Sequence, residues 1–475
     1  MKKLIIVFVT FLTVCCLLAP SAALAFTSDI LDQPSFTYTL DGFSYKEASF
    51  TENGALQKIF YGEYNTTQEN AKYEWVIHSI RSGSETTRST VMEIATDYEQ
   101  NTGRKVIFAA NGDYFDLNTG ANMESYVNNG IVVSKGSFAT KHCIGFDNNG
   151  NVAIGRMTEV EKRLAVYTEG KPTFFTIDKF NQQPSEGEIA VYDTVGSFTV
   201  SDAGVTIVNT DEVNLSMYPV FGVSNTTVNG VKESKSFTLK SGQFAVVYTS
   251  EDEEFFSAHS YGCETDLVEI PSGQYQGCTW VLGGYDILVN DYVVNTNCHT
   301  DNSGNVAAPR TLIGFKEDGT GFLCMLDGRQ PSYAVGVTVN QQAQIAAALG
   351  ARYALELDGG GSTTVLVRID DVLTLRNKPS DGSMRKVSNA IMLVEVDEQS
   401  DVTENPDDKP VNPDDPVNPD GKPVNPDGGD GTTSETPPAL TWDFILAIVL
   451  CCIIIVLSVV SVIILVGKKG KKGGK

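Results

Sequence analysis

The middle of the chain, from about residue 130 to 330, is a succession of short apolar runs that turn-forming residues interrupt. The tripeptides NNG at 148–150 and EDG at 317–319 lie between such runs and are typical of tight hairpins. Hairpins join neighbouring antiparallel strands, and little helical periodicity intervenes. This pattern therefore predicts an α+β domain with one large, mostly antiparallel sheet and a few flanking helices.

Two segments show helical spacing, and each leads into a strand and then a loop. In the first, apolar residues over 85–101 share one helical face, and Gly103 is expected to end that helix. The run VIFAA (106–110) then predicts a short buried strand that delivers the loop NGDYF (111–115).

The second segment repeats this order nearer the C-terminus. Thr338 is a suitable N-cap for a helix that extends to Ala348, and the strand YALEL (353–357) runs directly into the loop DGGGS (358–362). Each segment therefore ends in a loop that carries an aspartate beside glycine. Residues 26–396 contain no internal repeat and are expected to form one large domain.

The two ends of the chain differ from this region. Residues 1–25 combine two early lysines, an apolar run and a small-residue end, which is typical of a cleavable secretory signal. Residues 444–466 carry no charge and are long enough to span a bilayer, and the lysine-rich tail 467–475 is expected to be cytoplasmic. The sequence thus predicts a single-pass type I protein of the cell membrane with an extracellular ectodomain.

The segment before the predicted span, residues 397–438, contains 12 acidic residues, 2 basic residues and nine prolines. Such a segment cannot bury enough apolar surface to fold, so we expect a disordered stalk. The whole chain has a formal net charge of −24 at pH 7. Because that charge repels polyanions, it argues against nucleic acid as a partner.

The loop DGGGS has the most specific chemistry in the chain. Its three glycines remove every Cβ after the strand end, so backbone N–H groups can approach a ligand while Asp358 supplies a carboxylate. A plain tight turn needs fewer glycines. We therefore expect Asp358 to be catalytic and the rest of the loop to bind substrate: Gly359, Gly360, Gly361 and Ser362.

Other candidates are less specific. Asp113 follows Asn111 and Gly112 on a comparable loop, although Asn-Gly by itself is an ordinary turn. Arg310 and Arg329 are candidate anion-binding residues because a guanidinium fits phosphate or carboxylate bidentately, while many arginines only solvate a surface. The residues alone leave both interpretations open.

Several segments resemble, in this order, the phosphodiester glycosidase family: NGDYF, GFDNNG, VLGGYDILVND, APRTLIGF, LDGR, GVTVNQQAQIAAALGARYALELDGGGSTT and SNAIML. The resemblance covers roughly residues 107–394, within a glycosidase-like region 107–396, and leaves 26–106 as an N-terminal part of the ectodomain. Two positions depart from the family pattern. Asp113 stands where many relatives have glycine, and Val337 stands where methionine is usual.

The resemblance implies a hydrolase that cleaves a sugar 1-phosphodiester, commonly of N-acetylglucosamine, into free sugar and a phosphomonoester. It implies that Asp358 lies near the anomeric carbon, while Arg310 and Arg329 hold the phosphate. The expected substrate is a cell-wall or capsular polymer that carries such diesters. Further residues are expected to assist the reaction or to bind the sugar: Asp113, Asn111, Gly112 and Asp327.

Two alternatives remain open at this point. Asp113, Asp327 and Asp358 are hard oxygen ligands that would suit Mg²⁺ or Ca²⁺, and a cation held there would make the protein a metal-assisted phosphodiesterase. No other cofactor is implied. A signal, a stalk and a membrane span would equally serve a noncatalytic binder of cell-wall glycans.

Overall fold

The structure is a computed structural model that describes residues 28–52, 54–82, 85–136, 141–168, 171–215, 219–228, 235–249, 264–298 and 305–396. These residues belong to one compact unit. No helix among them has the length and apolar content of a membrane span. The predicted signal, stalk, span and cytoplasmic tail lie outside the described residues: 1–25, 397–438, 444–466 and 467–475.

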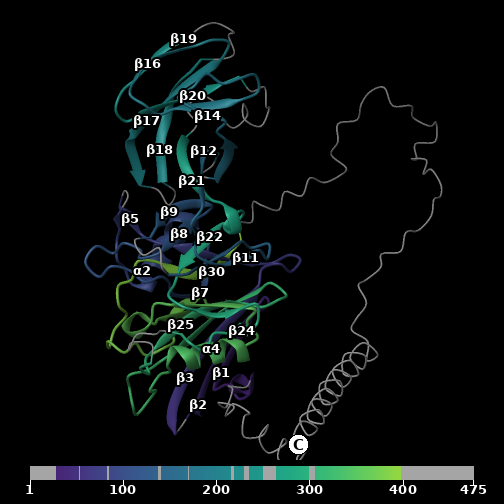
Figure 1. Cartoon of the computed structure of the whole chain (residues 1–475). Helices are drawn as coiled ribbons and strands as arrows, with labels where there is room; N and C mark the ends of the chain where they lie inside the picture. The colour runs from purple at the N-terminus through teal and green to yellow at the C-terminus, as the bar shows by residue number, and fades with distance from the viewer. Residues whose placement is uncertain are drawn as a thin grey trace, which may run out of the picture. The chain divides into compact units, whose positions relative to one another are not determined.

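The fold is dominated by antiparallel strands, as predicted, but these form several sheets rather than the one large sheet that we expected (Figure 1). Twisted sheets tend to split as strands are added, and hairpin signals do not specify where they split. The first sheet has eight strands, in the order β1 (Phe36–Leu40), β2 (Phe43–Glu52), β3 (Ala55–Asn65), β26 (Thr320–Leu326), β25 (Arg310–Phe315), β27 (Tyr353–Leu357), β23 (Ile287–Asn290) and β24 (Val293–Val294).

A five-stranded sheet shares the largest apolar core with this first sheet. Phe60 and Leu323 of the first sheet and Phe108 and Met392 of the second are completely buried in that core. Burial of such side chains is the main favourable term in folding. The strand order is β29 (Val372–Leu375), β28 (Val365–Ile369), β7 (Val106–Asn111), β30 (Ala390–Glu395) and β4 (Tyr73–His78).

Two further sheets are formed by the strands from β8 to β22. One is five-stranded: β11 (Val152–Gly155), β10 (Cys143–Phe146), β22 (Trp280–Gly283), β8 (Ser125–Asn128) and β9 (Ile131–Lys135). The other is eight-stranded: β13 (Lys171–Thr176), β12 (Val160–Thr168), β21 (Glu264–Pro271), β18 (Pro219–Val228), β17 (Gly204–Leu215), β20 (Gln243–Tyr248), β15 (Ile189–Tyr192) and β14 (Lys179–Phe180). Two-stranded ribbons complete the set: β16 (Gly196–Val200) with β19 (Lys235–Leu239), and β5 (Arg81–Ser82) with β6 (Glu85–Thr86).

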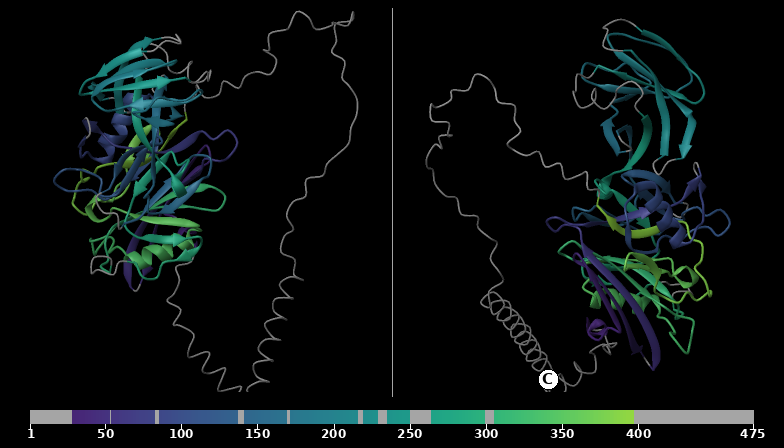
Figure 2. Two further views of the ribbon diagram at one scale, coloured as in Figure 1. Left: turned by 45° about the horizontal axis from the view of Figure 1, so that its top comes forward. Right: turned by 180° about the vertical axis from the view of Figure 1, so that it is seen from behind.

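Residues 160–271 are an insertion between β11 and β22. Both of these strands pair with β10, so the chain leaves the five-stranded sheet and returns to it on either side of one strand. The inserted strands, which include β12, β17 and β21, form a sheet of their own that is seen in teal in Figures 1 and 2. β21 contacts β9, and Lys135 and Glu269 form an ion pair there at 2.7 Å.

The described residues contain two α-helices. The first, α2, spans Val91–Thr102 and ends at Gly103, as predicted, but it begins six residues later than the expected start at Glu85. A capping box sets this start, because Thr90 Oγ1 accepts from the Glu93 backbone N–H while the Glu93 carboxylate accepts from the Thr90 backbone N–H. The other short helices are α4 (Val339–Ala348), whose predicted N-cap is confirmed, and the 3-10 turns η1 (Ser28–Leu31), η2 (Gly273–Tyr275) and η3 (Gly360–Ser362).

The two helix-to-strand segments bring their loops to the same place, although β7 and β27 belong to different sheets. The backbone N–H of Asp358 donates to the Gly112 carbonyl at 3.1 Å. The side chain of Asn111 returns the link, since its Nδ2 donates to the Asp358 carbonyl at 2.5 Å. The ends of the two sheets are therefore joined where the two aspartate-glycine loops begin.

Candidate active site

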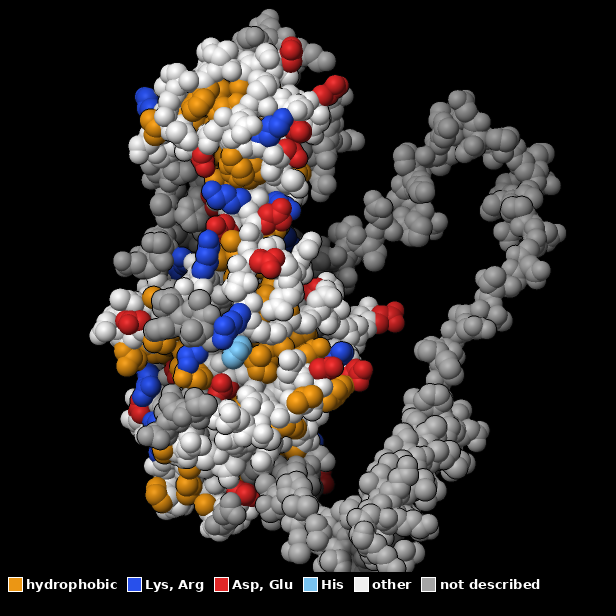
Figure 3. Space-filling view, in the orientation of Figure 1, with side chains coloured by type: hydrophobic (Ala, Val, Ile, Leu, Met, Phe, Trp, Pro, Cys, Tyr) orange, Lys and Arg blue, Asp and Glu red, His pale blue; other side chains and the backbone are white. Residues whose placement is uncertain are grey.

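Residues from both loops and from neighbouring hairpins line a cavity of ≈ 740 Å³, which is within the usual range for small-molecule sites. It brings together Asp358, Arg310 and Arg329 with the three glycines 359–361, as the sequence predicted. Elsewhere, on the face drawn in Figure 3, basic and acidic side chains are interleaved. Among the side chains that line the cavity, basic ones outnumber acidic ones, which suits an anionic ligand: Lys141, Arg310, Arg329 and Arg385 against Glu124 and Asp358. Two acids outside the lining, Glu356 and Asp381, pair with Arg310 and Arg385.

Asp358 is the carboxylate at the centre of this loop arrangement. It follows β27 directly and is half-buried. Burial raises the pKa of its carboxyl to about 6, although hydrogen bonds from Ser362 and the Gly359 backbone and the positive charge of Arg385 act to lower that pKa. Asp358 can therefore be ionised at neutral pH and still accept a proton in mild acid.

Arg310 lies on the cavity wall, but its guanidinium is bound to the protein. Nη1 contacts Glu356 Oε1 at 3.2 Å, Nε donates to the Val337 carbonyl at 3.1 Å, and Nη2 donates to the Val306 carbonyl at 2.9 Å. Glu356 is completely buried, and Arg310 is only 7% exposed. Arg310 therefore neutralises a buried carboxylate and braces two backbone segments, rather than offering its full fork to a phosphate.

The guanidinium of Arg329, in contrast to that of Arg310, is exposed to the cavity. It makes no ion pair or side-chain hydrogen bond within the part of the chain that the structure describes. A Cβ placed on Gly360 would lie 3.0 Å from Arg329 Nη1, so the guanidinium lies against the glycine loop. Among the predicted phosphate-binding residues, Arg329 is the one whose donors are available.

Asp327 does not line the cavity, in contrast to our expectation. Its buried carboxylate accepts from Tyr333 Oη at 3.0 Å, Asn377 Nδ2 at 2.9 Å and the Lys378 backbone N–H at 2.9 Å. These bonds use the oxygens that a ligand would need. Asp327 instead fixes the turn two residues before Arg329, which has a positive φ of 61°.

Arg385 is a cavity residue that the sequence analysis missed. Its Nη2 and Nε contact Asp381 Oδ2 at 2.7 and 3.0 Å, and Nη1 approaches Ser362 Oγ at 3.5 Å. Because Ser362 also bonds the Asp358 carboxylate, a polar chain connects Arg385 to Asp358. No motif or spacing marks Arg385 in the sequence, apart from its place between DGGGS and SNAIML.

Gly361 is required by the close approach of this arginine. A Cβ at this position would lie 2.1 Å from Asp381 Oδ2 and 2.2 Å from Arg385 Nη2. Both atoms end flexible, partly exposed side chains, so Gly361→Ala should displace the ion pair and leave the backbone in place. We expect kcat/KM to fall roughly tenfold, as for the loss of one charged hydrogen bond. The melting temperature should fall by no more than about 3 °C.

Enzyme assays and thermal melts of Gly361→Ala would check this expectation. Gly382→Ala provides a comparison outside the cavity, because no atom lies within 4 Å of a Cβ there, although its φ of 84° adds backbone strain. A loss of melting temperature in Gly361→Ala larger than that in Gly382→Ala would contradict our account of a flexible neighbour.

Asp113 lies behind the cavity wall rather than on it. It is 1% exposed, its Oδ2 accepts from Asn122 Nδ2 at 3.3 Å, and its Oδ1 has no partner among the described residues. Burial, with the charges of Glu124 and Asp358, holds the pKa of Asp113 well above its usual range. The catalytic role expected for Asp113 from the sequence stays a prediction, and its place behind the wall would let it act only through its neighbours.

Glu124 is the second carboxyl on the cavity wall, and the sequence analysis missed it. A Cβ placed on Gly283 would lie 2.4 Å from Glu124 Cβ and 2.6 Å from Asp113 Oδ1, so these two acids are close neighbours. Burial raises the pKa of Glu124 to about 7 despite the opposing charges of Lys141 and Arg156. Two acids with raised pKa values thus line one cavity, and a pair of carboxyl groups can serve as acid and base in hydrolysis of a glycosidic bond.

Asn111 joins the two loops and does not line the cavity. Its Oδ1 accepts from Thr311 Oγ1 at 2.9 Å and from the Thr364 backbone N–H at 3.2 Å, while its Nδ2 is bound to the Asp358 carbonyl. Its amide nitrogen therefore holds the Asp358 backbone, while its amide oxygen is bound by Thr311 and Thr364. Two other predicted substrate-binding residues also lie behind the wall: Gly112 and Ser362.

Two tyrosines on the cavity wall were also missed by the sequence analysis. The rings of Tyr114 and Tyr285 are 5.9 Å apart between centroids, and Tyr114 Oη donates to Glu356 Oε1 at 3.2 Å. Lys141 Nζ lies 2.9 Å from the centroid of the Tyr285 ring. Aromatic faces with a polar end suit a sugar ring, which has apolar C–H faces and polar edges.

The described residues contain no group of three or more His, Cys, Asp or Glu side chains arranged to hold a metal ion. The proposed set of Asp113, Asp327 and Asp358 is not brought together, because Asp327 is bound by the Asn377 and Lys378 segment. The structure therefore does not form the three-aspartate cation site that we considered from the sequence.

Residues 189–394 match the model of a protein family described as phosphodiester glycosidase. The resemblance that the sequence motifs suggested is therefore confirmed for this part of the chain. The match includes Arg329, Asp358 and Arg385, while Asn111 and Glu124 precede it. None of the curated proteins matches the chain.

The chain is also similar to several solved structures. One is a hypothetical protein from Synechocystis, at 16% identity and a TM-score of 0.46, over 77% of this chain and 64% of that one. Another is a putative exported protein from Burkholderia pseudomallei, at 15% identity and a TM-score of 0.39, over 72% of this chain and 75% of that one. A third is the catalytic domain of zebrafish N-acetylglucosamine-1-phosphodiester alpha-N-acetylglucosaminidase, auto-inhibited by its pro-peptide. The identity is 15% and the TM-score 0.35, over 79% of this chain and 94% of that one. The chain thus spans slightly less than two thirds of the Synechocystis protein.

Proposed function

We propose that this protein, whose residues 189–394 match the phosphodiester glycosidase family, hydrolyses glycosyl 1-phosphodiesters to free sugar and a phosphomonoester. One observation carries the proposal. The half-buried Asp358 shares a cation-rich cavity with Arg329 and Arg385, and all three lie in the matched segment. A carboxylate beside anion-binding donors is what cleavage at a sugar-phosphate bond requires.

The reaction breaks the bond between the anomeric carbon and the phosphate oxygen, and the phosphate leaves with the bonding electron pair. Positive charge then develops on the sugar ring, where an ionised Asp358 can stabilise it or activate the attacking water. Water supplies the new hydroxyl of the sugar, and its proton passes to a carboxylate or to solvent. Arg329, Arg385 and the N–H groups of the glycine loop stabilise the departing phosphate.

Glu124 and the two tyrosines complete this division of roles. A phosphate monoester is a weak base, so it needs little protonation to leave, and Glu124 with a pKa of about 7 can supply the proton that it does need. Tyr114 and Tyr285 offer faces for the sugar ring. Arg310 and Glu356 act from behind as a neutral pair that holds the wall in place.

The pH dependence of this reaction should follow Asp358 and Glu124. Because the pKa of Asp358 is about 6 and its ionised form is needed, kcat/KM for a sugar 1-phosphodiester should rise with pH through about 6, and it should fall again above about 7 as Glu124 loses the proton that it supplies. The contribution of Asp358 to folding stability changes in the opposite direction, because it falls as pH rises. The folded state raises this pKa above the ordinary 3.8, so the contribution of Asp358 to stability is present below pH 4 and is lost as pH rises through about 6.

Initial rates of the full-length protein between pH 4.5 and 8 would test this profile. The residual activity of Asp358→Asn should lack the acid limb. A wild-type profile that is flat across this range would contradict the assigned role of Asp358.

The position of bond cleavage tests the function itself. Hydrolysis in ¹⁸O-labelled water should place the label in the released sugar. Label in the phosphate, together with loss of activity in EDTA, would instead indicate a metal-assisted phosphodiesterase. Binding of glycan with no released product would indicate a noncatalytic binder. We propose N-acetylglucosamine as the sugar, and a panel of sugar 1-phosphodiesters would identify it.

The terminal segments support a cell-surface location in this proposal. A secretory signal over residues 1–25 and an anchor over 444–466 would place the cavity outside the cell, next to wall or capsular polymers. Protease treatment of intact cells that express the full chain would test this, since residues 26–396 should be released without lysis.

A further inference from the structure

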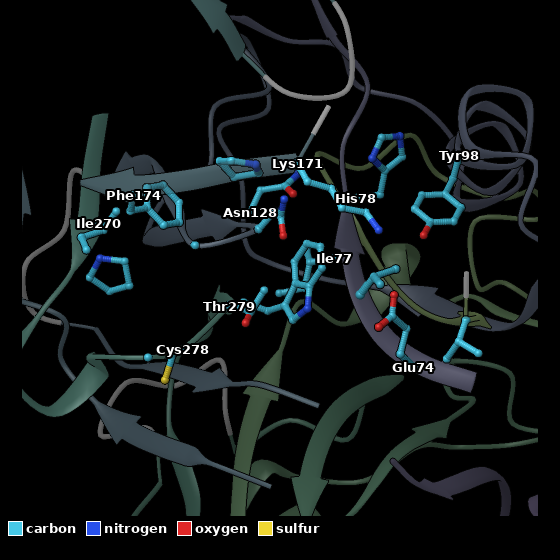
Figure 4. A pocket seen from close by; sticks show the side chains of 18 of the residues that line it. Glu74, Ile77, His78, Tyr98, Asn128, Lys171, Phe174, Ile270, Cys278 and Thr279 are labelled. Carbon is cyan, nitrogen blue, oxygen red and sulfur yellow. The ribbon is translucent and has the colours of Figure 1, made fainter. Parts of the chain in front are cut away.

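A second cavity of ≈ 520 Å³ lies away from the charged loops, where inserted strands β13 and β21 meet β4 and the β8–β9 turn. Figure 4 shows Phe174 on one side of it, Tyr98 and His78 on the other, and Asn128 between them. Its lining comes from segments far apart in the sequence. The volume is sufficient for a small ligand or part of a longer one.

The charged groups of this second cavity are largely neutralised by protein partners. Arg104 Nη2 contacts Glu74 Oε1 at 2.5 Å, and Arg104 Nε donates to the Glu395 carbonyl. His78 Nε2 contacts Asp97 Oδ2 at 2.8 Å. A strongly charged ligand would have to break such pairs, so this cavity differs from the cation-rich one around Asp358.

The exposed Lys171 also lines the cavity, and Asn128 Nδ2 donates to Tyr126 Oη at 3.0 Å. The rest of the lining that can contact a ligand consists of neutral polar atoms and aromatic faces. Asn128, Asn129 and Thr279 are partly exposed on the cavity wall, and the ring of Phe174 is half-buried there. The indole Nε1 of Trp280 is buried with no acceptor among the described residues. An unpaired buried donor is costly, so a hydroxyl that reached it would be bound favourably.

This combination fits a saccharide. Sugar hydroxyls both donate and accept hydrogen bonds, as amide and hydroxyl side chains require, and the C–H faces of a sugar ring pack on aromatic rings. A neutral sugar also leaves the Arg104–Glu74 and His78–Asp97 pairs intact.

Two neighbouring strands connect this second cavity to the first. Along β8, Asn128 lines the second cavity, and Glu124, just before the strand, lines the first. Along β22, Trp280 lines the second cavity, and Gly284, just beyond the strand, lines the first. In each case the two positions are four residues apart, which is about 13 Å along an extended strand. That distance is within reach of a few linked sugars.

We propose that this second cavity binds the saccharide chain of a polymeric substrate while its phosphodiester lies beside Asp358. The part of the inference that concerns turnover rests on the proposed function. The part that concerns saccharide binding does not.

The test compares a small and a polymeric substrate in the full-length protein. We expect the double variant Asn128→Ala/Thr279→Val to raise KM for a cell-wall polymer carrying glycosyl phosphodiesters by about tenfold, the loss expected for two hydrogen bonds. Its kcat/KM for a small sugar 1-phosphodiester should stay within twofold of wild type. Thr173→Val is a matched control, because residues 172 and 174 line the cavity and alternate side chains of β13 point to opposite faces.

A direct binding measurement separates the two parts of the inference. Calorimetry should show that the neutral oligosaccharide obtained by dephosphorylating the polymer binds Asp358→Asn, and that adding Asn128→Ala/Thr279→Val weakens this binding about tenfold. Unchanged polymer KM together with unchanged binding in the double variant would overturn the proposal. If neither substrate is hydrolysed but the oligosaccharide still binds through these residues, the proposed function fails and the saccharide site stands.

Discussion

Replacing Asp358 with asparagine is expected to lower kcat for a sugar 1-phosphodiester by roughly 10³-fold. The amide keeps the shape of the carboxylate but can neither stabilise the developing positive charge nor take a proton from water. KM should change little, because Arg329, Arg385 and the glycine loop, which hold the phosphate in our proposal, are untouched. Steady-state kinetics of the purified full-length variant would measure both quantities.

This variant should remain folded. The carboxyl of Asp358 has a raised pKa, so its ionised form opposes folding at pH 7, and the neutral amide should make the protein as stable as wild type or slightly more stable. A thermal melt provides the control. Wild-type turnover in Asp358→Asn would refute the assignment of this residue, and a lower melting temperature would refute our account of its pKa.

Glu356→Ala is expected to lower the free energy of unfolding by about 3–5 kcal/mol. Removing this carboxylate leaves Arg310, which is 7% exposed, as an uncompensated buried cation and leaves Tyr114 Oη without its acceptor. Urea unfolding followed by fluorescence would give the change as a shift in midpoint. Activity should fall as well, because the cavity wall loses its support.

The double replacement Arg310→Met/Glu356→Leu is the informative comparison. Apolar residues of similar volume remove both charges together, so they should recover much of the stability that Glu356→Ala loses. Glu317→Ala, at an exposed acid of the β25–β26 turn, should change stability by less than about 0.5 kcal/mol. Equal losses in Glu356→Ala and Glu317→Ala would show that the Arg310–Glu356 contact does not support the fold.

Local signals in the sequence predicted individual elements well. The strands 106–110 and 353–357 and the helix after Thr338 lie where the pattern placed them, because caps, apolar runs and glycines act over a few residues. The arrangement of sheets was not predictable in this way. β3 pairs with β26, about 260 residues further along the chain, and no short-range pattern specifies such a partner.

The candidate site shows the same division. Asp358 and its glycines form a contiguous motif, so the sequence alone could propose them, and the structure places Asp358 and Gly359–Gly361 on the cavity wall. Glu124, Tyr285 and Arg385 reach the cavity only through tertiary packing, and their residue types are common on any protein surface. Arg310 was correctly placed at the cavity, yet its partner Glu356 lies across a strand pair and could not be inferred from spacing.

The way in which residues 160–271 join the fold has an evolutionary consequence. Their two connections emerge from strands on either side of β10, so this module can be lengthened, shortened or exchanged while the scaffold around Asp358 keeps its geometry. If residues 160–271 help to bind a polymeric substrate, as we propose, selection could change which polymer binds without altering the residues around Asp358.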